Sequence, residues 1–432
     1  MIKELPAYYS YNGLLVALSP VLAGYLAWTV ARSRRSLSII MRQLGLGLTL
    51  GERRSGPRVW IQAVSVGETV ASEPVFSELR RLLPEADLTL STTTSAGNEM
   101  AKKSVADADH VIYFPIDLVP SVKRALAVVN PDVFVMVETE IWPNFLFHCR
   151  KRGVPVAIVN GCLSDRTYNW GRKLKWVYKW ALSGVDKLCM QSAEDARRVI
   201  ELGARPECVE VVGNCKFDQL PSGLGEEERR AMRDGLKIAN GDPVLVAGST
   251  NPGEEEQVMD AFRDLRRKFG NLRLIIAPRQ LNRTDSIASI VSGYGFSSGR
   301  RSEAAFLSGK EDVVILDTMG ELAAIYGIAS VAFVGGSLIP KGGHNILQPI
   351  AHGRPVVFGP YTHKTRDLVR ITKDAGVGFQ VQDSSGLCNA VDSLLSDAGK
   401  LREVCDKAVA LIETNRGASR RCAEAIAGLC PK

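Results

Sequence analysis

Several common signatures are missing from this chain of 432 residues, and each absence excludes a class of protein. No G-x-G-x-x-G follows the first apolar run of either half, which disfavours a nicotinamide or flavin enzyme. No P-loop lysine motif, tandem repeat or low-complexity segment is visible. The nine cysteines form no C-x-x-C pair, and the five histidines are dispersed. This usage favours a reducing compartment over a disulfide framework or a zinc site, so we expect no metal and no cofactor.

Charged residues are also missing from Gly13 to Ala31, a run of about nineteen residues that is near the length needed to cross a bilayer. The basic residues that follow it are Arg32, Arg34, Arg35 and Arg42. By the positive-inside rule the rest of the chain faces the cytoplasm, and a cleaved signal peptide is disfavoured. We therefore predict an N-terminal membrane-anchor helix. Ser19-Pro20 leaves both a spanning and a shallowly inserted helix open.

Apolar runs that are typical of buried strands alternate with longer amphipathic stretches, which indicates parallel sheets of βαβ units. The alternation breaks in a polar stretch at Gly213–Gly241. We predict an α/β chain with two Rossmann-like domains that face a cleft. Residues 1–50 form the anchor and connector, 51–212 the first domain, and 213–432 the second domain with a C-terminal helix. The predicted strands are 59–64, 88–92, 111–114, 133–137, 154–159, 187–190, 244–247, 272–277, 313–316, 331–334, 356–358 and 378–381.

Acidic and hydroxyl side chains follow several predicted strands of the first half. Glu68 comes shortly after strand 59–64, where it suits a general base, or equally the first turn of a helix. Glu138 and Glu140 follow strand 133–137, and alternation predicts that one of them enters the cleft. Thr93 and Ser95 follow strand 88–92 as candidates for sugar or phosphate binding, with a helix N-cap as the alternative.

A glycine-rich loop in the second half suits an anion. Strand 331–334 leads into Gly335-Gly336-Ser337, and Lys341-Gly342-Gly343-His344-Asn345 follows, with a helix expected to begin near Asn345. Free backbone N–H groups and the positive end of a helix dipole would then point at one spot, which suits a phosphate.

Three other strand ends of the second half carry groups that suit a nucleotide. Ser249 follows strand 244–247, Pro278 and Arg279 close strand 272–277, and the turn Met319-Gly320-Glu321 follows strand 313–316. Since the carboxyl ends of parallel strands meet at one edge, we expect a nucleotide site there.

The segment Arg166–Trp180 interleaves basic and aromatic residues, which suits a membrane headgroup interface. Nucleic acid would accept such a segment too. We favour the membrane because an anchor is predicted upstream, and because no RNA-binding signature accompanies the net charge of +7.

The motifs SVGE, ETEIWPN, GNCKFD, APR, MGEL and FVGG…GGHN…QP, in this order, closely resemble the bacterial 3-deoxy-D-manno-octulosonic acid (Kdo) transferases of lipopolysaccharide synthesis. The resemblance implies an inverting, metal-independent glycosyltransferase of the GT-B type. Such an enzyme transfers Kdo from CMP-Kdo to the lipid A precursor, lipid IVA, at the cytoplasmic face of the inner membrane. The first domain would bind the acceptor and the second CMP-Kdo.

The resemblance also assigns roles residue by residue. Glu68 matches the family's general base, Glu138 an acidic residue that supports the transition state, and Lys216 an assisting basic residue. The positions that match CMP-binding segments are Pro278, Arg279, Met319, Gly320, Glu321, Asn345, Ile346, Leu347 and Gln348.

Two positions depart from the family's pattern, because Gln62 stands where many members have histidine and Gln348 where glutamate is usual. A carboxylate at 348 could accept bonds from both ribose hydroxyls, whereas an amide accepts and donates. The departure therefore bears on nucleotide affinity and selectivity. The remaining alternatives are a GT-B transferase or epimerase that uses a UDP-sugar, and a membrane-attached protein with a vestigial nucleotide site.

Overall fold

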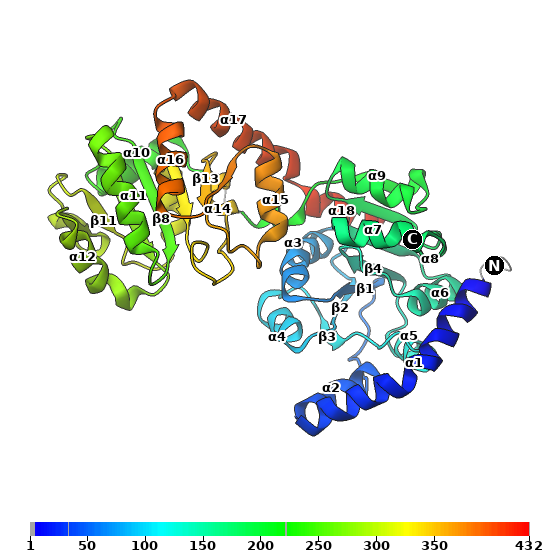
Figure 1. The fold of residues 1–432 in the computed structure, drawn as a ribbon. Helices are drawn as coiled ribbons and strands as arrows, with labels where there is room; N and C mark the ends of the chain where they lie inside the picture. Colours follow the sequence, from blue (N-terminus) through cyan, green and yellow to red (C-terminus); the bar gives the residue numbers. More distant parts are fainter. Residues whose placement is uncertain (1–4, 33, 221–222, 432) are drawn as a thin grey trace. The chain divides into compact units, whose positions relative to one another are not determined.

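The computed structural model describes residues 5–32, 34–220 and 223–431, which divide into two units (Figure 1). Unit 1 comprises Met1–Gln219 and Asn415–Lys432, and unit 2 comprises Leu220–Thr414. Each unit contains a seven-stranded sheet whose neighbouring strands run parallel. The prediction of an α/β chain with two parallel-sheet domains is confirmed.

The sheet of unit 1 has the strand order β3-β2-β1-β4-β5-β6-β7. Its strands are β1 Arg58–Ala63, β2 Asp87–Thr92, β3 His110–Tyr113, β4 Val133–Val137, β5 Val156–Gly161, β6 Lys187–Met190 and β7 Val209–Val211. Its main helices are α3 Val66–Leu82, α4 Ser95–Ser104, α5 Val119–Val129, α6 Pro143–Arg152, α7 Asp165–Lys173, α8 Lys175–Leu182, α9 Ala193–Glu201 and α18 Ala418–Ala427.

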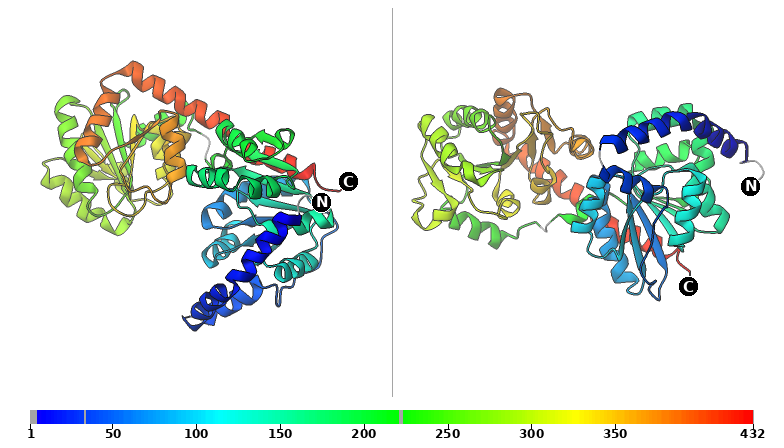
Figure 2. Two further views of the ribbon diagram at one scale, coloured as in Figure 1. Left: turned by 45° about the vertical axis from the view of Figure 1, so that its right-hand side comes forward. Right: turned by 90° about the horizontal axis from the view of Figure 1, so that it is seen from below.

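Helices cover both faces of this sheet (Figure 2). Alternate residues of β1 point to opposite faces, so Trp60 packs in one apolar cluster and Val59 and Ile61 in the other. Residues of α5, α6, α8 and α9 complete the cluster around Trp60, and residues of α3, α4 and α18 complete the second. Because both faces are covered, polar side chains are accommodated mainly where the strands end.

The sheet of unit 2 has the strand order β10-β11-β9-β8-β12-β13-β14. Its strands are β8 Val244–Thr250, β9 Arg273–Pro278, β10 Ser298–Arg300, β11 Val313–Ile315, β12 Val331–Val334, β13 Val356–Phe358 and β14 Gly378–Gln380. Its helices include α10 Glu226–Gly235, α11 Glu255–Lys268, α12 Thr284–Gly293, α13 Leu322–Ile325, α14 Leu347–Ala351, α15 Arg366–Asp374, α16 Ser384–Leu395 and α17 Ala398–Asn415.

The strands predicted from the sequence all have counterparts in these two sheets, whereas β7 and β10 were not predicted. Both are edge strands of three residues, with the sequences VEV and SGR. Three residues are too few to show an apolar run or an alternation that sequence analysis could detect.

The predicted boundary at residue 213 differs from the observed division, because unit 1 continues to Gln219 and regains residues 415–432. The physical reason is that Cys422 and Ile426 of α18 pack in the same apolar cluster as Phe76 of α3. The Asp218 carboxylate also accepts hydrogen bonds from the Gly417 N–H at 2.6 Å and the Ser419 N–H at 2.7 Å. Asp218 thereby caps α18, whose N-cap glycine has no side chain to do so.

The predicted anchor region falls in α1, Leu5–Arg32, which is followed by α2, Arg34–Gln43. Among the described residues, no helix combines the length and apolar character that crossing a membrane requires. Three of the four arginines from which the orientation was predicted, Arg32, Arg34 and Arg35, have side chains outside the described part, whereas Arg42 is exposed on α2. Attachment to a membrane stays a prediction.

Replacing Asp218 with alanine should loosen α18 from unit 1. The variant leaves two backbone N–H groups at the start of α18 without their acceptor, so we expect the free energy of unfolding to fall by about 1–2 kcal/mol. Urea unfolding measures this loss, and faster trypsin cleavage after Arg416 should accompany it. Glu207→Ala, at an exposed position of the same unit, is the control. Equal stability and cleavage rates in the two variants would contradict the capping role.

Candidate functional site

Glu68 lies where β1 meets α3. Ser65 is the N-cap of α3, and its hydroxyl accepts a hydrogen bond from the Glu68 N–H at 3.4 Å. In return the Glu68 carboxylate accepts hydrogen bonds from the Val64 N–H at 2.6 Å and the Ser65 hydroxyl at 2.9 Å. Glu68 is 7% exposed. It is therefore both a first-turn residue of a helix and a buried carboxylate at a strand end.

The carboxylate of Glu68 is held in an environment that favours its protonated form. Burial and, after it, the negative charge of Glu138 raise the pKa of Glu68 from the ordinary 4.5 to about 7. Hydrogen bonds from Val64 and Ser65 oppose the increase, and Glu140 adds to it. The negative charges of Glu138 and Glu140 therefore both act on Glu68. That only one of the two enters the cleft stays a prediction. A carboxylate with a pKa near neutrality is suited to accept a proton in catalysis.

Glu138 and Lys216 form an ion pair beside Glu68. Glu138 directly follows β4 and has a φ of +61°. Its N–H donates to the Val159 carbonyl at 2.9 Å. The Glu138 Oε1 atom lies 3.6 Å from the Lys216 Nζ atom, and the two side chains are 25% and 18% exposed. Lys216, which the predicted boundary put in the second domain, belongs to unit 1.

Buried amide side chains fix the segment that carries Lys216. The Asn160 Oδ1 atom accepts a hydrogen bond from the Cys215 N–H at 2.9 Å, and Gln191 Nε2 donates to the Asn160 carbonyl at 2.9 Å. Gln191 Oε1 in turn accepts from Asn214 Nδ2 at 2.9 Å, while Asn214 Oδ1 accepts from the Lys216 N–H at 2.9 Å. Asn160 is the last residue but one of β5 and Gln191 directly follows β6, and sequence reasoning did not single them out. Their signal was weak because an amide at a strand end is a common turn residue.

Thr93 and Ser95 follow β2, the strand beside β1. Gln62, which is 1% exposed, donates from Nε2 to the Thr93 hydroxyl at 3.1 Å. The N-cap of α4 is Thr94, whose hydroxyl accepts from the Gly97 N–H at 3.0 Å. Ser95 is exposed on the first turn of α4. Thr93 is thus hydrogen-bonded to a buried side chain of β1, whereas Ser95 faces solvent.

In unit 2 the predicted groups follow strands that are direct neighbours in the order β11-β9-β8-β12. Ser249, in β8, has a φ of +56°. Pro278 ends β9 and is buried, while the next residue, Arg279, is exposed. The Arg279 N–H donates to the Thr250 carbonyl at 2.9 Å, which ties the two strand ends together.

The first part of the glycine-rich loop after β12 differs from its prediction, because its backbone N–H groups are not free. The N–H groups of Gly336, Ser337 and Leu338 donate to the Glu254 carboxylate at 2.7, 3.0 and 2.9 Å. Glu254 is fully buried and also accepts from the Asn251 N–H at 3.1 Å. The loop does hold an anion, but that anion is a carboxylate of the same unit.

The helix expected near Asn345 begins at Leu347 and has five residues. The Asn345 Oδ1 atom accepts from the Leu347 N–H at 3.0 Å. Ile346 and Leu347 are buried, Gln348 is half-buried and Asn345 is exposed. The side chains of Ile346 and Leu347 thus belong to the core, so only their backbone could reach a ligand.

The turn Met319–Glu321 is open to solvent at its first two residues. Met319 is 87% exposed, and Gly320 has a φ of +86°. Glu321 accepts a hydrogen bond from the Arg301 guanidinium at 2.9 Å. That guanidinium holds the pKa of Glu321 below its usual range.

Basic side chains act on one another at the glycine-rich loop, and one of them, Lys364, was not selected by sequence reasoning. Burial lowers the pKa of His344, and the positive charges of Arg279 and Lys364 lower it further. The Nε2 atom of His344 lies 3.4 Å from Asn251 Nδ2. His344 was visible as part of its motif, whereas Lys364 lies outside every motif. Among the described residues, no three potential metal ligands come together.

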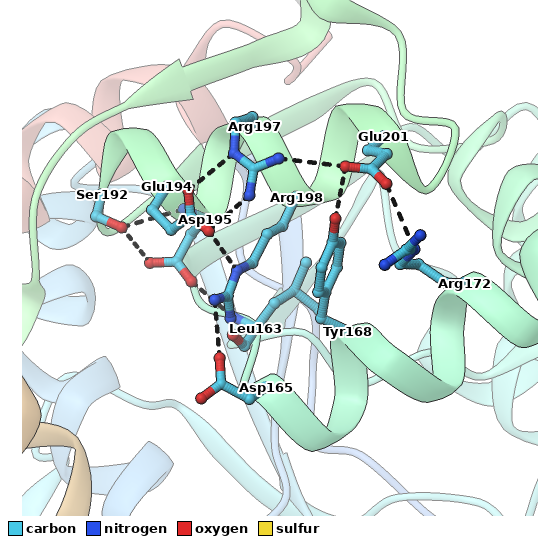
Figure 3. Close-up of polar contacts among 10 residues, drawn as sticks. All are labelled: Leu163, Asp165, Tyr168, Arg172, Ser192, Glu194, Asp195, Arg197, Arg198 and Glu201. Carbon is cyan, nitrogen blue, oxygen red and sulfur yellow. Dashed lines mark hydrogen bonds and ion pairs between the residues drawn. The ribbon is translucent and has the colours of Figure 1, made fainter.

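The basic and aromatic segment of α7 and α8 is fastened to α9 on one side (Figure 3). Arg198 pairs with Asp165 and Glu194, each at 2.8 Å, and its guanidinium lies 5.0 Å from the centroid of the Tyr168 ring. The Tyr168 hydroxyl donates to Glu201 at 2.5 Å. Asp165 and Tyr168 of α7 are thus bonded to charged side chains of α9 within the protein.

Other side chains of the same segment stay at the surface. Trp170 and Trp176 are each 55% exposed, and Leu174 between them is 43% exposed. The Lys173 ammonium lies 5.0 Å from the centroid of the Trp170 ring. Exposed tryptophan beside lysine is the combination found at membrane headgroup interfaces.

Known proteins resemble this chain over most of its length. Residues 40–219 match a family model described as 3-deoxy-D-manno-octulosonic-acid transferase (kdotransferase). A 3-deoxy-D-manno-octulosonic acid transferase from Bordetella pertussis is 31% identical over 379 residues, which cover 85% of this chain and 86% of that protein. Its counterpart from Haemophilus influenzae is 29% identical and covers 95% of this chain and 96% of that protein. A bifunctional glycosyltransferase/methyltransferase from Fusobacterium nucleatum is 34% identical over 80% of this chain, which spans 54% of that protein.

Solved structures share the fold at lower identity. The UDP-GlcNAc 2-epimerase from Neisseria meningitidis, bound to UDP-GlcNAc, has a TM-score of 0.55 at 13% identity, over 86% of this chain and 100% of that one. A glycosyltransferase from Rickettsia africae has a TM-score of 0.51 at 13% identity, over 87% of this chain and 99% of that one. At such identity the likeness shows the fold alone.

Replacing Glu68 with glutamine tests its raised pKa. Because the folded-state pKa of about 7 exceeds 4.5, the folded protein keeps a proton that the unfolded chain has already lost between these values. Glu68 therefore lowers the free energy of unfolding as the pH rises through this range. We therefore expect the thermal unfolding midpoint of Glu68→Gln minus that of the wild type to increase as the pH is raised from about 5 to about 8. Exposed Glu207→Gln should follow the wild type, and a constant difference for Glu68→Gln would contradict the raised pKa.

Replacing Glu254 with glutamine should weaken the glycine-rich loop. One carboxylate oxygen becomes an amide nitrogen that cannot accept hydrogen bonds, so buried N–H groups lose an acceptor. We expect the free energy of unfolding to fall by about 2–3 kcal/mol, with faster amide exchange at residues 336–338. Glu256→Gln, exposed at the start of the same helix, is the matched control. If both variants match the wild type in urea unfolding and exchange, the carboxylate does not hold the loop.

Proposed function

The chain belongs to the family of 3-deoxy-D-manno-octulosonic acid (Kdo) transferases, and we propose that it transfers Kdo from CMP-Kdo to the lipid A precursor, lipid IVA, with inversion at the anomeric carbon. The observation that carries the proposal is the buried Glu68 carboxylate at the end of β1, with a pKa of about 7 and the Glu138–Lys216 ion pair beside it. A base near neutrality is what activation of a hydroxyl nucleophile requires.

The proposed reaction is a single displacement without a metal ion. Glu68 accepts the proton of the acceptor hydroxyl while that oxygen bonds to the anomeric carbon of Kdo. The bond from that carbon to the CMP phosphate breaks, and CMP leaves with the bonding electron pair. Because attack and departure occur on opposite sides, the anomeric centre inverts. Lys216 supplies positive charge near the reacting centre, and Glu138 keeps Lys216 in place.

Unit 2 is proposed to hold the donor. Arg279 is exposed just after β9, and the positive charges of Arg279 and Lys364 both act on His344. Such a group suits the phosphate of CMP and the carboxylate of Kdo. Ser249 and the CMP positions assigned by the resemblance, including the exposed Met319 and the half-buried Gln348, follow neighbouring strands of the same sheet. The amide of Gln348 would accept one ribose hydroxyl bond and donate another.

Unit 1 is proposed to meet the lipid-borne acceptor at the cytoplasmic surface of the inner membrane. Leu14, Val16 and Leu18 of α1 are 58%, 71% and 49% exposed, and Trp170 and Trp176 are exposed on α7 and α8. Apolar side chains with flanking lysines suit the boundary between headgroups and acyl chains. Thr93 and Ser95, at the end of the neighbouring strand, are candidates to contact the sugar or phosphate of the acceptor.

Replacing Glu68 with alanine should abolish transfer while CMP binding persists. Removal of a general base lowers turnover by about 10²–10⁴-fold. The assay incubates the protein with CMP-Kdo and a tetraacyl lipid A precursor in vesicles and identifies the products by mass spectrometry, with CMP binding followed by calorimetry. Exposed Glu207→Ala should retain wild-type turnover. Retained turnover in Glu68→Ala would remove Glu68 from the base role, and competition by UDP in place of CMP would favour a UDP-sugar enzyme.

A further inference from the structure

A polar cluster fastens α1 to unit 1 at one turn of the helix. The Tyr11 hydroxyl donates to Asp117 Oδ2 at 3.0 Å. The side-chain amides of Asn12 and Asn144 bond to each other in both directions, at 2.8 and 3.0 Å. One turn earlier, the Tyr8 ring stacks on Phe147 with centroids 4.1 Å apart. This end of α1 is therefore attached through directional bonds and not only through apolar contact.

The same cluster sets the position of α6. Trp142, the N-cap of α6, makes no capping bond with its side chain. The Asp117 carboxylate takes that role and accepts from the Asn144 N–H at 3.0 Å and the Phe145 N–H at 2.8 Å. Asn144 Nδ2 also donates to the Asp117 carbonyl at 2.7 Å. Asp117 is 6% exposed and Asn144 fully buried, so solvent offers no substitute for these bonds.

The start of α6 is one end of the loop that carries Glu138. Residues 138–142 connect β4 to α6 and are held by these two elements. Inside the loop, the Thr139 hydroxyl and the Trp142 Nε1 atom are buried without a hydrogen-bond partner. The polar atoms of these two side chains therefore add no hydrogen bond to the loop, and the bonds that Asp117 makes at the start of α6 are among those that hold it.

The second N-terminal helix reaches the same region. The carbonyl of Gln43, the last residue of α2, accepts from the Ile116 N–H at 2.9 Å. Gln43 Nε2 donates to the Thr93 carbonyl at 3.0 Å. Residues 116–117 are therefore hydrogen-bonded to both N-terminal helices. Through Gln43, α2 is also bonded to the residue that follows β2.

We propose that Tyr11 and Asn12 of α1 are positioning residues for Glu138. Through Asp117 and Asn144 they hold the start of α6, and α6 in turn holds the loop that presents Glu138 to Glu68 and Lys216. The N-terminal helices then have a role in catalysis as well as in attachment to a lipid surface. This inference rests on the proposed function, because Glu138 is assigned its role there.

The test compares Tyr11→Phe and Asn12→Ala in the full-length protein with Tyr9→Phe, which makes the same change at a residue of α1 that is 65% exposed. Displacement of the catalytic loop should lower kcat about tenfold, with the KM for CMP-Kdo within about twofold of the wild type. Amide exchange of residues 138–145 should become faster in both variants and stay unchanged in Tyr9→Phe. A role in attachment alone would instead raise the KM for the acceptor and leave kcat and exchange unchanged.

Two results separate this inference from the proposed function. If kcat and exchange in Tyr11→Phe and Asn12→Ala equal those in Tyr9→Phe, the positioning role is overturned, whatever Glu68 does. If exchange rises as expected but Glu68→Ala retains turnover, Tyr11 and Asn12 do hold the loop that carries Glu138, and the general-base assignment fails. Because amide exchange needs no substrate, it remains informative in either case.

Discussion

In a parallel sheet that is buried on both faces, charged side chains are accommodated mainly at the ends of the strands. The residues of β1 and β4 are all buried, so a carboxylate within them would lose its hydration without compensation. Because β2, β1 and β4 are neighbours, the groups that follow them are brought together whatever their distance in the sequence. Thr93, Glu68 and Glu138 meet at the edge of the unit 1 sheet for this reason.

Bringing carboxylates to one edge has an electrostatic cost, and the surrounding residues offset part of it. Glu68 is buried near two other glutamates, which raises its pKa, while bonds from Val64 and Ser65 stabilise its charged form. Lys216 supplies the opposite charge to Glu138. The segment that carries this lysine is held by buried amides from the ends of β5 and β6, so the position of the cation depends on side chains outside the ion pair.

Local patterns in the sequence predicted much of this arrangement. Apolar runs predicted the central strands of both sheets. The expectation that functional side chains follow the carboxyl ends of parallel strands selected Glu68, Glu138 and Arg279. The same rules failed where the pattern was absent or its partner was distant. The edge strands β7 and β10 are too short to detect. The glycine-rich loop was interpreted as a ligand site because its sequence indicates that an anion is bound without indicating which one. Its partner, Glu254, lies 82 residues before Gly336.

The sequence by itself determined the α/β class, the order of strands and helices, the candidate groups at the strand ends and the resemblance to Kdo transferases. These follow from periodicity, turn chemistry and motif order, which act over a few residues at a time. Only the tertiary structure decided that Lys216 belongs to unit 1, that α18 returns to cover the sheet of that unit, and that Tyr11 is bonded to Asp117. Each of these depends on contacts between distant segments, such as Asp218 with Ser419, 201 residues apart. Burial of apolar surface selects such contacts across the whole chain, and no local pattern encodes them.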